Sequence, residues 1–104
     1  MSVNKNALIR YQVLDRCFGN AGRMYFWEDL LEECNKALTE FDPGCEGIQR
    51  RQLFDDIRFM ESEAGWSIPL ARIRYGRKVF YRYEDLSFSI RNQPLNASEA
   101  EQIK

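Results

Sequence analysis

The sequence predicts a single, mostly helical α+β domain in which three helices are followed by a β-hairpin. With 104 residues, 44% of them hydrophobic, the chain can bury one compact core and is too short for two. Apolar residues recur at helical spacing in three segments of the first two thirds of the chain. After Trp66 the spacing changes to the alternation that is typical of strands.

The first helix is expected over residues 4–18, where Asn4 or Ser2 can cap it. Its apolar residues at helical spacing are Leu8, Tyr11, Leu14 and Phe18. Two glycines within residues 19–22 end this helix, and residues 23–25 can form a very short extended segment.

The second helix is expected over residues 26–41, with an apolar stripe on one side and acidic residues on its N-terminal half. The helix dipole favours anions at that end, and such a run of charge is most simply a solvated helix face. The stripe consists of Trp27, Leu30, Leu31, Cys34, Leu38 and Phe41, and the acids are Glu28, Asp29, Glu32 and Glu33.

A loop rich in Pro and Gly over residues 42–47 precedes the third helix, which is expected over residues 49–63. At 100° per residue, Leu53, Ile57 and Met60 fall on the side that faces the core. The opposite side then carries Arg51, Asp55, Arg58 and Ser62, with Gln52, Phe54 and Phe59 on the flanks.

The hairpin is expected over residues 68–83, because β-branched and aromatic residues flank a turn at Gly76. Arg72 and Arg74 share one face of its first strand, and Arg77 and Lys78 lie at its tip. The aromatic residues expected in the core beneath the hairpin are Trp66, Phe80, Tyr81 and Tyr83.

The net charge of −1 and the pI near 5.5 argue against a nucleic-acid binder when taken alone. The charge is segregated, however. Residues 26–46 hold seven acids and one base, whereas residues 47–83 hold eight bases and four acids. Segregated charge creates local potentials that the pI conceals, so residues 47–83 are the segment from which a partner is inferred.

Several function classes are excluded by residue type. Histidine is absent, which removes His-based acid–base catalysis and His-containing metal sites. The three cysteines form no C-x-x-C pair and are expected to be small buried hydrophobes. There is no Gly-rich phosphate loop, and no apolar run approaches the ~20 residues of a membrane span. We therefore expect a cytoplasmic protein with no catalytic residues, metal or cofactor and no membrane partner.

Three helices that lead into a basic hairpin are the arrangement of a winged helix-turn-helix domain. In such a domain one helix fits the major groove, and the hairpin can lie along phosphates or the minor groove. Double-stranded DNA is accordingly the predicted partner, with helix 49–63 in the major groove and hairpin 68–83 on the backbone or minor groove. The candidate DNA-binding residues are Gln49, Arg50, Arg51, Gln52, Asp55, Arg58, Arg72, Arg74, Arg77 and Lys78.

Simpler roles remain open for these cations. Arg50 and Arg51 can be solvated helix charges, and Arg58 can pair with Asp55. The hairpin cations can protect an edge strand from aggregation. Asp56 is expected to form an intramolecular salt bridge. The alternative function is a winged-helix protein–protein interaction module that uses the acidic helix 26–41.

The segment IQRRQLFDDIRFM (residues 48–60), followed by EAGW (residues 63–66), resembles the recognition helix of bacterial repressors of the deoxyribose-operon type. Along nearly its whole length the chain is similar to the N-terminal domains of WYL-domain transcriptional regulators. The resemblance implies a bacterial, DNA-binding, often homodimeric transcription factor whose effector ligand binds a downstream domain. Residues 1–90 would form the DNA-binding domain, and residues 91–104 a linker and the start of a helix.

Two residues depart from the family pattern. Gln49 stands at a position where the family has Ser, which weakens the N-cap of the third helix. Asp55 stands where the family has Arg, on the outward side of that helix. A carboxylate there repels phosphate, yet it can accept a hydrogen bond from cytosine N4.

Overall fold

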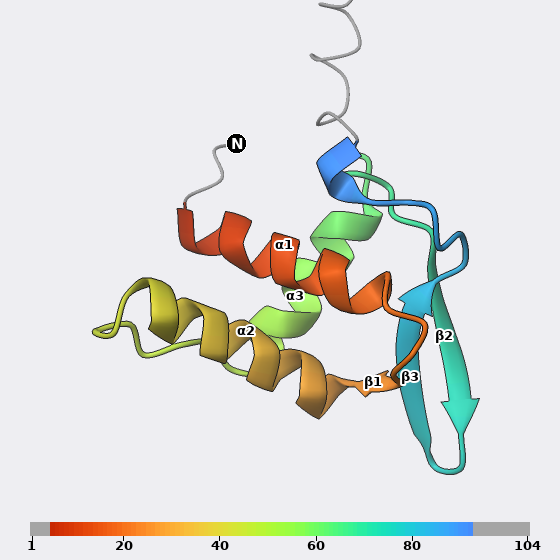
Figure 1. The fold of residues 1–104 in the computed structure, drawn as a ribbon, viewed down its shortest axis with the longest axis horizontal. Helices are drawn as coiled ribbons and strands as arrows, with labels where there is room; N and C mark the ends of the chain where they lie inside the picture. The colour runs from red at the N-terminus through yellow and green to blue at the C-terminus, as the bar shows by residue number, and fades with distance from the viewer. Residues whose placement is uncertain (1–4, 93–104) are drawn as a thin grey trace, which may run out of the picture.

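The computed structural model describes residues 5–92 (Figure 1). The elements are α1 (Lys5–Phe18), β1 (Tyr25–Phe26), α2 (Trp27–Phe41), α3 (Arg50–Glu61), β2 (Leu70–Tyr75), β3 (Lys78–Tyr83) and the 3₁₀ turn η1 (Ile90–Asn92). Three helices and a three-stranded antiparallel sheet confirm the predicted fold class. The expected linker and helix start within residues 91–104 lie, after Asn92, outside the described residues.

The core lies between the three helices and one face of the sheet. Tyr11, Leu14 and Phe18 of α1 are buried as expected, but Leu8 is 42% exposed. In the first turns of α1 the buried position belongs to Ala7 instead. Phe41, the last residue of the apolar stripe expected on the second helix, is 53% exposed at the end of α2, one turn past the buried Leu38.

The sheet has the order β1-β3-β2, so β2 is an edge strand. Leu70 pairs with Tyr83 and Arg72 with Tyr81, which puts these four side chains on one face because side chains alternate along a strand. Tyr81 and Tyr83 are buried there among the helices. Arg72 and, two residues further on, Arg74 therefore lie on the face of the sheet that is turned toward the helices.

The aromatic residues expected beneath the hairpin are all buried, although Phe80 lies on the other face of the sheet. Its ring packs edge-on against Phe26, with 6.2 Å between the ring centroids. The hairpin turn passes through Gly76, whose φ of +65° is a conformation that glycine adopts without strain. The predicted turn position is thus confirmed.

Two buried aspartates connect the elements. Asp56 of α3 accepts a hydrogen bond from Arg10 Nε of α1 at 2.6 Å, which confirms the expected intramolecular salt bridge. Asp15 of α1 accepts hydrogen bonds from Tyr83 Oη at 2.7 Å, Ser89 Oγ at 2.8 Å and Ile90 N at 2.9 Å. Burial and the hydrogen bond to Asp15 raise the pKa of Tyr83.

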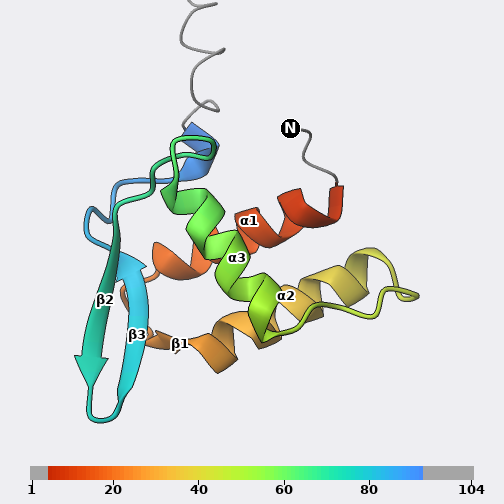
Figure 2. The same cartoon turned by 180° about the vertical axis from the view of Figure 1, so that it is seen from behind.

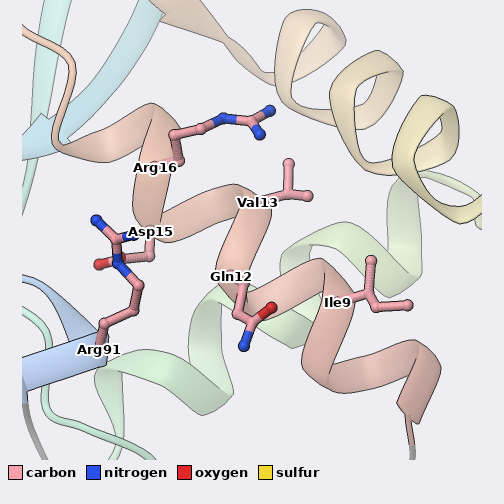
Figure 3. A pocket seen from close by; sticks show the side chains of 6 residues that line it. All are labelled: Ile9, Gln12, Val13, Asp15, Arg16 and Arg91. Carbon is pink, nitrogen blue, oxygen red and sulfur yellow. The ribbon is translucent and has the colours of Figure 1, made fainter. Parts of the chain in front are cut away.

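A cavity of about 380 Å³ lies beside Asp15. Figure 3 shows the six residues that line it, which are Ile9, Gln12, Val13, Asp15 and Arg16 of α1 and Arg91 of η1. The segment that follows β3 is therefore held against α1, with Asp15 as its hydrogen-bonding anchor.

Two of the three cysteines are buried as expected. Burial raises the pKa of the Cys17 thiol to about 11 and that of the Cys34 thiol to about 12. Cys45, in the loop before α3, is only half-buried. Since only the thiolate is a nucleophile, Cys17 and Cys34 stay unreactive at neutral pH.

Candidate nucleic-acid interface

The outward side of α3 carries three of the predicted site residues. Leu53, Ile57 and Met60 are buried in the core, so the opposite side of the helix is turned to solvent. Arg51, Asp55 and Arg58 lie on that exposed side at intervals of four and three residues, as the spacing predicts. Figure 2 shows α3 in front of α1, next to the hairpin.

At the start of α3, the side chain of Arg50 lies against two aromatic rings. Gln49 is the exposed N-cap residue and makes no side-chain capping hydrogen bond, as its departure from the family pattern suggests. The Arg50 guanidinium lies 4.6 Å from the centroid of the Trp27 ring and 5.6 Å from that of Phe54. Cation–π attraction therefore holds Arg50 at the junction of α2 and α3, beside the backbone N–H groups of the helix start.

Further along α3, intramolecular partners occupy three of the predicted residues. Gln52 Nε2 donates a hydrogen bond to Asp56 Oδ1 at 2.9 Å, which draws this amide toward the buried salt bridge. Arg58 Nη1 lies 2.9 Å from Asp55 Oδ1, so the pairing left open by the sequence is present. Arg51 makes no ion pair or hydrogen bond through its side chain to any residue within 5–92.

The hairpin cations also fall into two groups, those that contact an acidic side chain of the molecule and those that do not. Arg72 makes two hydrogen bonds to the Glu61 carboxylate, at 2.8 and 2.9 Å, and the bonding to Glu61 raises the pKa of Arg72. Lys78 Nζ lies 4.0 Å from Glu28 Oε2 and 5.3 Å from the centroid of the Phe26 ring. Arg74 and Arg77 are exposed and have no ion-pair partner in the described part of the chain.

Two residues outside the predicted site contact its members directly, and a third, Arg10, acts through Asp56, which accepts a hydrogen bond from Gln52. Glu61 joins the last turn of α3 to β2 through Arg72, Trp27 supports Arg50, and Arg10 neutralises Asp56. The Arg10–Asp56 and Arg72–Glu61 pairs join residues 46 and 11 positions apart. Helical or strand periodicity carries no information at these separations. The sequence therefore predicted a salt bridge for Asp56 without naming Arg10 as its partner, and it gave no sign of the Arg72–Glu61 pair.

The acidic cluster of α2 is largely neutralised within the molecule. Arg16 lies 3.4 Å from Glu33, Arg23 lies 3.5 Å from Asp29, and Lys78 approaches Glu28. Asp29 Oδ2 also accepts a hydrogen bond from the backbone N–H of Phe26, at the start of the helix. Glu32 is exposed and has no ion-pair partner among residues 5–92.

Residues 5–92 contain no group of three His, Cys, Asp or Glu side chains arranged to hold a metal ion. In the same part of the chain, no helix has the length and apolar character needed to cross a membrane. The arrangement thus consists of a solvent-facing helix with a basic β-hairpin beside it.

Three helices, an antiparallel sheet and a basic hairpin define a winged helix domain. Residues 6–84 match the family model of the N-terminal winged helix domain of WYL domain-containing proteins. The chain belongs to this family, which confirms the resemblance inferred from residues 48–66. Searches of curated proteins and of solved structures gave no match. Because the winged helix is a non-enzymatic DNA-binding fold, family membership suggests a DNA-binding regulator.

Proposed function

We propose that this chain is the sequence-specific, double-stranded DNA-binding domain of a bacterial, cytoplasmic transcriptional regulator. In this proposal α3 enters the major groove and the β2–β3 hairpin lies on the backbone or minor groove. The observation that carries it is the set of exposed arginines on α3 and the hairpin that lack an ion-pair partner in residues 5–92. These are Arg51, Arg74 and Arg77.

Unpartnered arginines on neighbouring surfaces are available to replace the counterions of DNA phosphates. Arg51 belongs to the outward side of α3, where an arginine can donate to guanine O6 and N7. Arg74 lies on the helix-facing side of β2 and Arg77 at the hairpin tip, positions suited to phosphate contacts. Arg50 is held beside the start of α3, where backbone N–H groups favour a phosphate.

The alternative, a protein-interaction module that uses the acidic helix, has weaker support. Arg16, Arg23 and Lys78 already oppose Glu33, Asp29 and Glu28. A basic partner would have to displace these cations or compete with them. The family relationship also supports two further proposals, a homodimer that binds two half-sites and an effector ligand that binds a WYL-type domain of the same protein.

Fluorescence-anisotropy titration of a mixed-sequence duplex tests the proposal. We expect binding that weakens between about 50 and about 200 mM salt, with a slope of log K against log[salt] of about −0.9 per neutralised phosphate. The double substitution Arg51→Ala/Arg74→Ala is expected to abolish the binding. Lys36→Ala removes an exposed cation of α2 that is not one of the candidate DNA-binding residues, and it is the control.

Absence of duplex binding by the wild-type chain at low salt would contradict the proposal. Binding that both the double substitution and the control reduce equally would indicate a diffuse charge effect rather than an interface on α3 and the hairpin.

A further inference from the structure

Asp55 is an acidic residue in the middle of the surface that faces DNA in the proposed function. Its carboxylate lies 2.9 Å from Arg58 Nη1, and the two side chains are 49% and 76% exposed. Neither side chain belongs to the core. An exposed carboxylate that faces a polyanion reduces affinity unless it contacts a base.

The other polar side chains of this part of α3 are held elsewhere. Gln52 is hydrogen-bonded to the buried Asp56, and the Arg50 guanidinium is stacked on Trp27. The centre of the outward side is therefore left to Asp55 and Arg58, with Arg51 one turn before them. Asp55, Arg58 and Arg51 are thus the charged side chains of this stretch that can reach base edges without leaving a core or aromatic contact.

The Asp55–Arg58 pair matches the major-groove edge of one kind of base pair. Guanine presents two acceptors, O6 and N7, and cytosine presents the N4 donor beside them. An ionised aspartate can only accept hydrogen bonds, and an arginine can only donate them. Since arginine has five N–H donors, Arg58 can keep its bond to Asp55 while it donates to guanine.

We propose that the Asp55–Arg58 pair makes α3 select a C·G base pair, with Asp55 accepting from cytosine N4 and Arg58 donating to guanine O6 and N7. This inference rests on the proposed function, because it requires the outward side of α3 to lie in the major groove. Asp55 is then a specificity-determining residue, and its cost in phosphate repulsion is offset only at sites that contain this pair.

Selection of bound duplexes from a randomised pool tests the inference on the wild-type chain, Asp55→Asn and Asp55→Ala. We expect the wild type to enrich a C·G pair at one position. Because asparagine pairs with adenine N6 and N7, Asp55→Asn should shift that position toward A·T. The shift in relative affinity should be about 5- to 150-fold, the discrimination of one good base contact. Asp55→Ala should enrich C·G there more weakly than the wild type, because only the contacts of Arg58 to guanine remain.

Glu40→Gln is the matched control, since it removes one exposed acid at the end of α2 and should leave the selected sequence unchanged. Enrichment of the same sequence to the same degree by the wild type and both Asp55 variants would overturn this inference while leaving the proposed function intact. A wild type that binds without preference for C·G at any position would do the same. If the wild-type chain binds no duplex from the pool, both this inference and the proposed function are overturned.

Discussion

Asp55 and Asp56 are neighbours in the sequence and each pairs with an arginine, yet they belong to opposite sides of α3. The side chains of Asp56 and Arg10 are only 2% and 11% exposed, and their pair joins α3 to α1. The Asp55–Arg58 pair lies within a single helix and is open to solvent. The same chemistry thus holds the fold together on one side and remains available to a partner on the other.

This difference has an energetic basis. Breaking a buried ion pair by removing one partner leaves an uncompensated charge in the interior. An exposed pair at i,i+3 is worth only a few tenths of a kcal/mol, because water solvates either charge alone. Substitutions on the two sides of α3 should therefore separate stability from DNA binding.

The largest expected effect on stability is that of Asp56→Ala. It leaves Arg10 buried without its carboxylate and removes the acceptor of Gln52, so we expect a loss of about 3–5 kcal/mol in the free energy of unfolding. Urea unfolding measures this loss. Asp55→Ala is the matched control, with an expected change below about 0.5 kcal/mol. Equal losses of unfolding free energy in the two variants would contradict the contrast between the buried and the exposed side of α3.

The second largest effect should be a loss of stability at alkaline pH, caused by two thiols buried in the core. The folded-state pKa values of Cys17 and Cys34, about 11 and about 12, lie above the ordinary thiol value of 9.0. The unfolded chain then binds fewer protons than the folded chain above pH 9, so stability is complete below that pH and is lost as the pH rises toward 11 and 12.

Thermal unfolding between pH 8 and pH 11 measures this dependence. The fall in Tm should be shallower in Cys34→Ala than in the wild type, because the variant lacks one of the two buried thiols. A Cys34→Ala variant with the wild-type slope would show that burial of this thiol does not contribute.

Substitutions of the hairpin arginines should have smaller effects, on the salt dependence of DNA binding and on stability. Arg74→Ala should make the salt slope shallower by about 0.9, the value for one phosphate contact, without changing stability. Arg72 is held by Glu61, so Arg72→Ala should lower stability by about 0.2–1 kcal/mol and change the salt slope less. A larger slope change in Arg72→Ala than in Arg74→Ala would show that the Glu61 contact opens on DNA.

Periodicity predicted the helices, the hairpin and the two sides of α3, because these depend on residues close together in the sequence. It failed at Leu8 and Phe41, since the period of a helix does not show where its packing partners end. Periodicity also could not predict which candidate cations have an intramolecular partner, because these partners come from tertiary contacts. Arg72 pairs with Glu61, and Arg50 lies on the Trp27 ring. The DNA contacts of the candidate residues remain predictions.

The most direct test of the central claim is the dissociation constant of Arg51→Ala for a duplex selected by the wild-type chain. Arg51 lies on the outward side of α3 without an ion-pair partner in the described chain, so its loss should remove a DNA contact and leave the fold intact. We predict an affinity loss of about 1–3 kcal/mol relative to Lys36→Ala, at unchanged Tm. Equal dissociation constants for Arg51→Ala and Lys36→Ala would contradict a DNA-binding role for this side of α3.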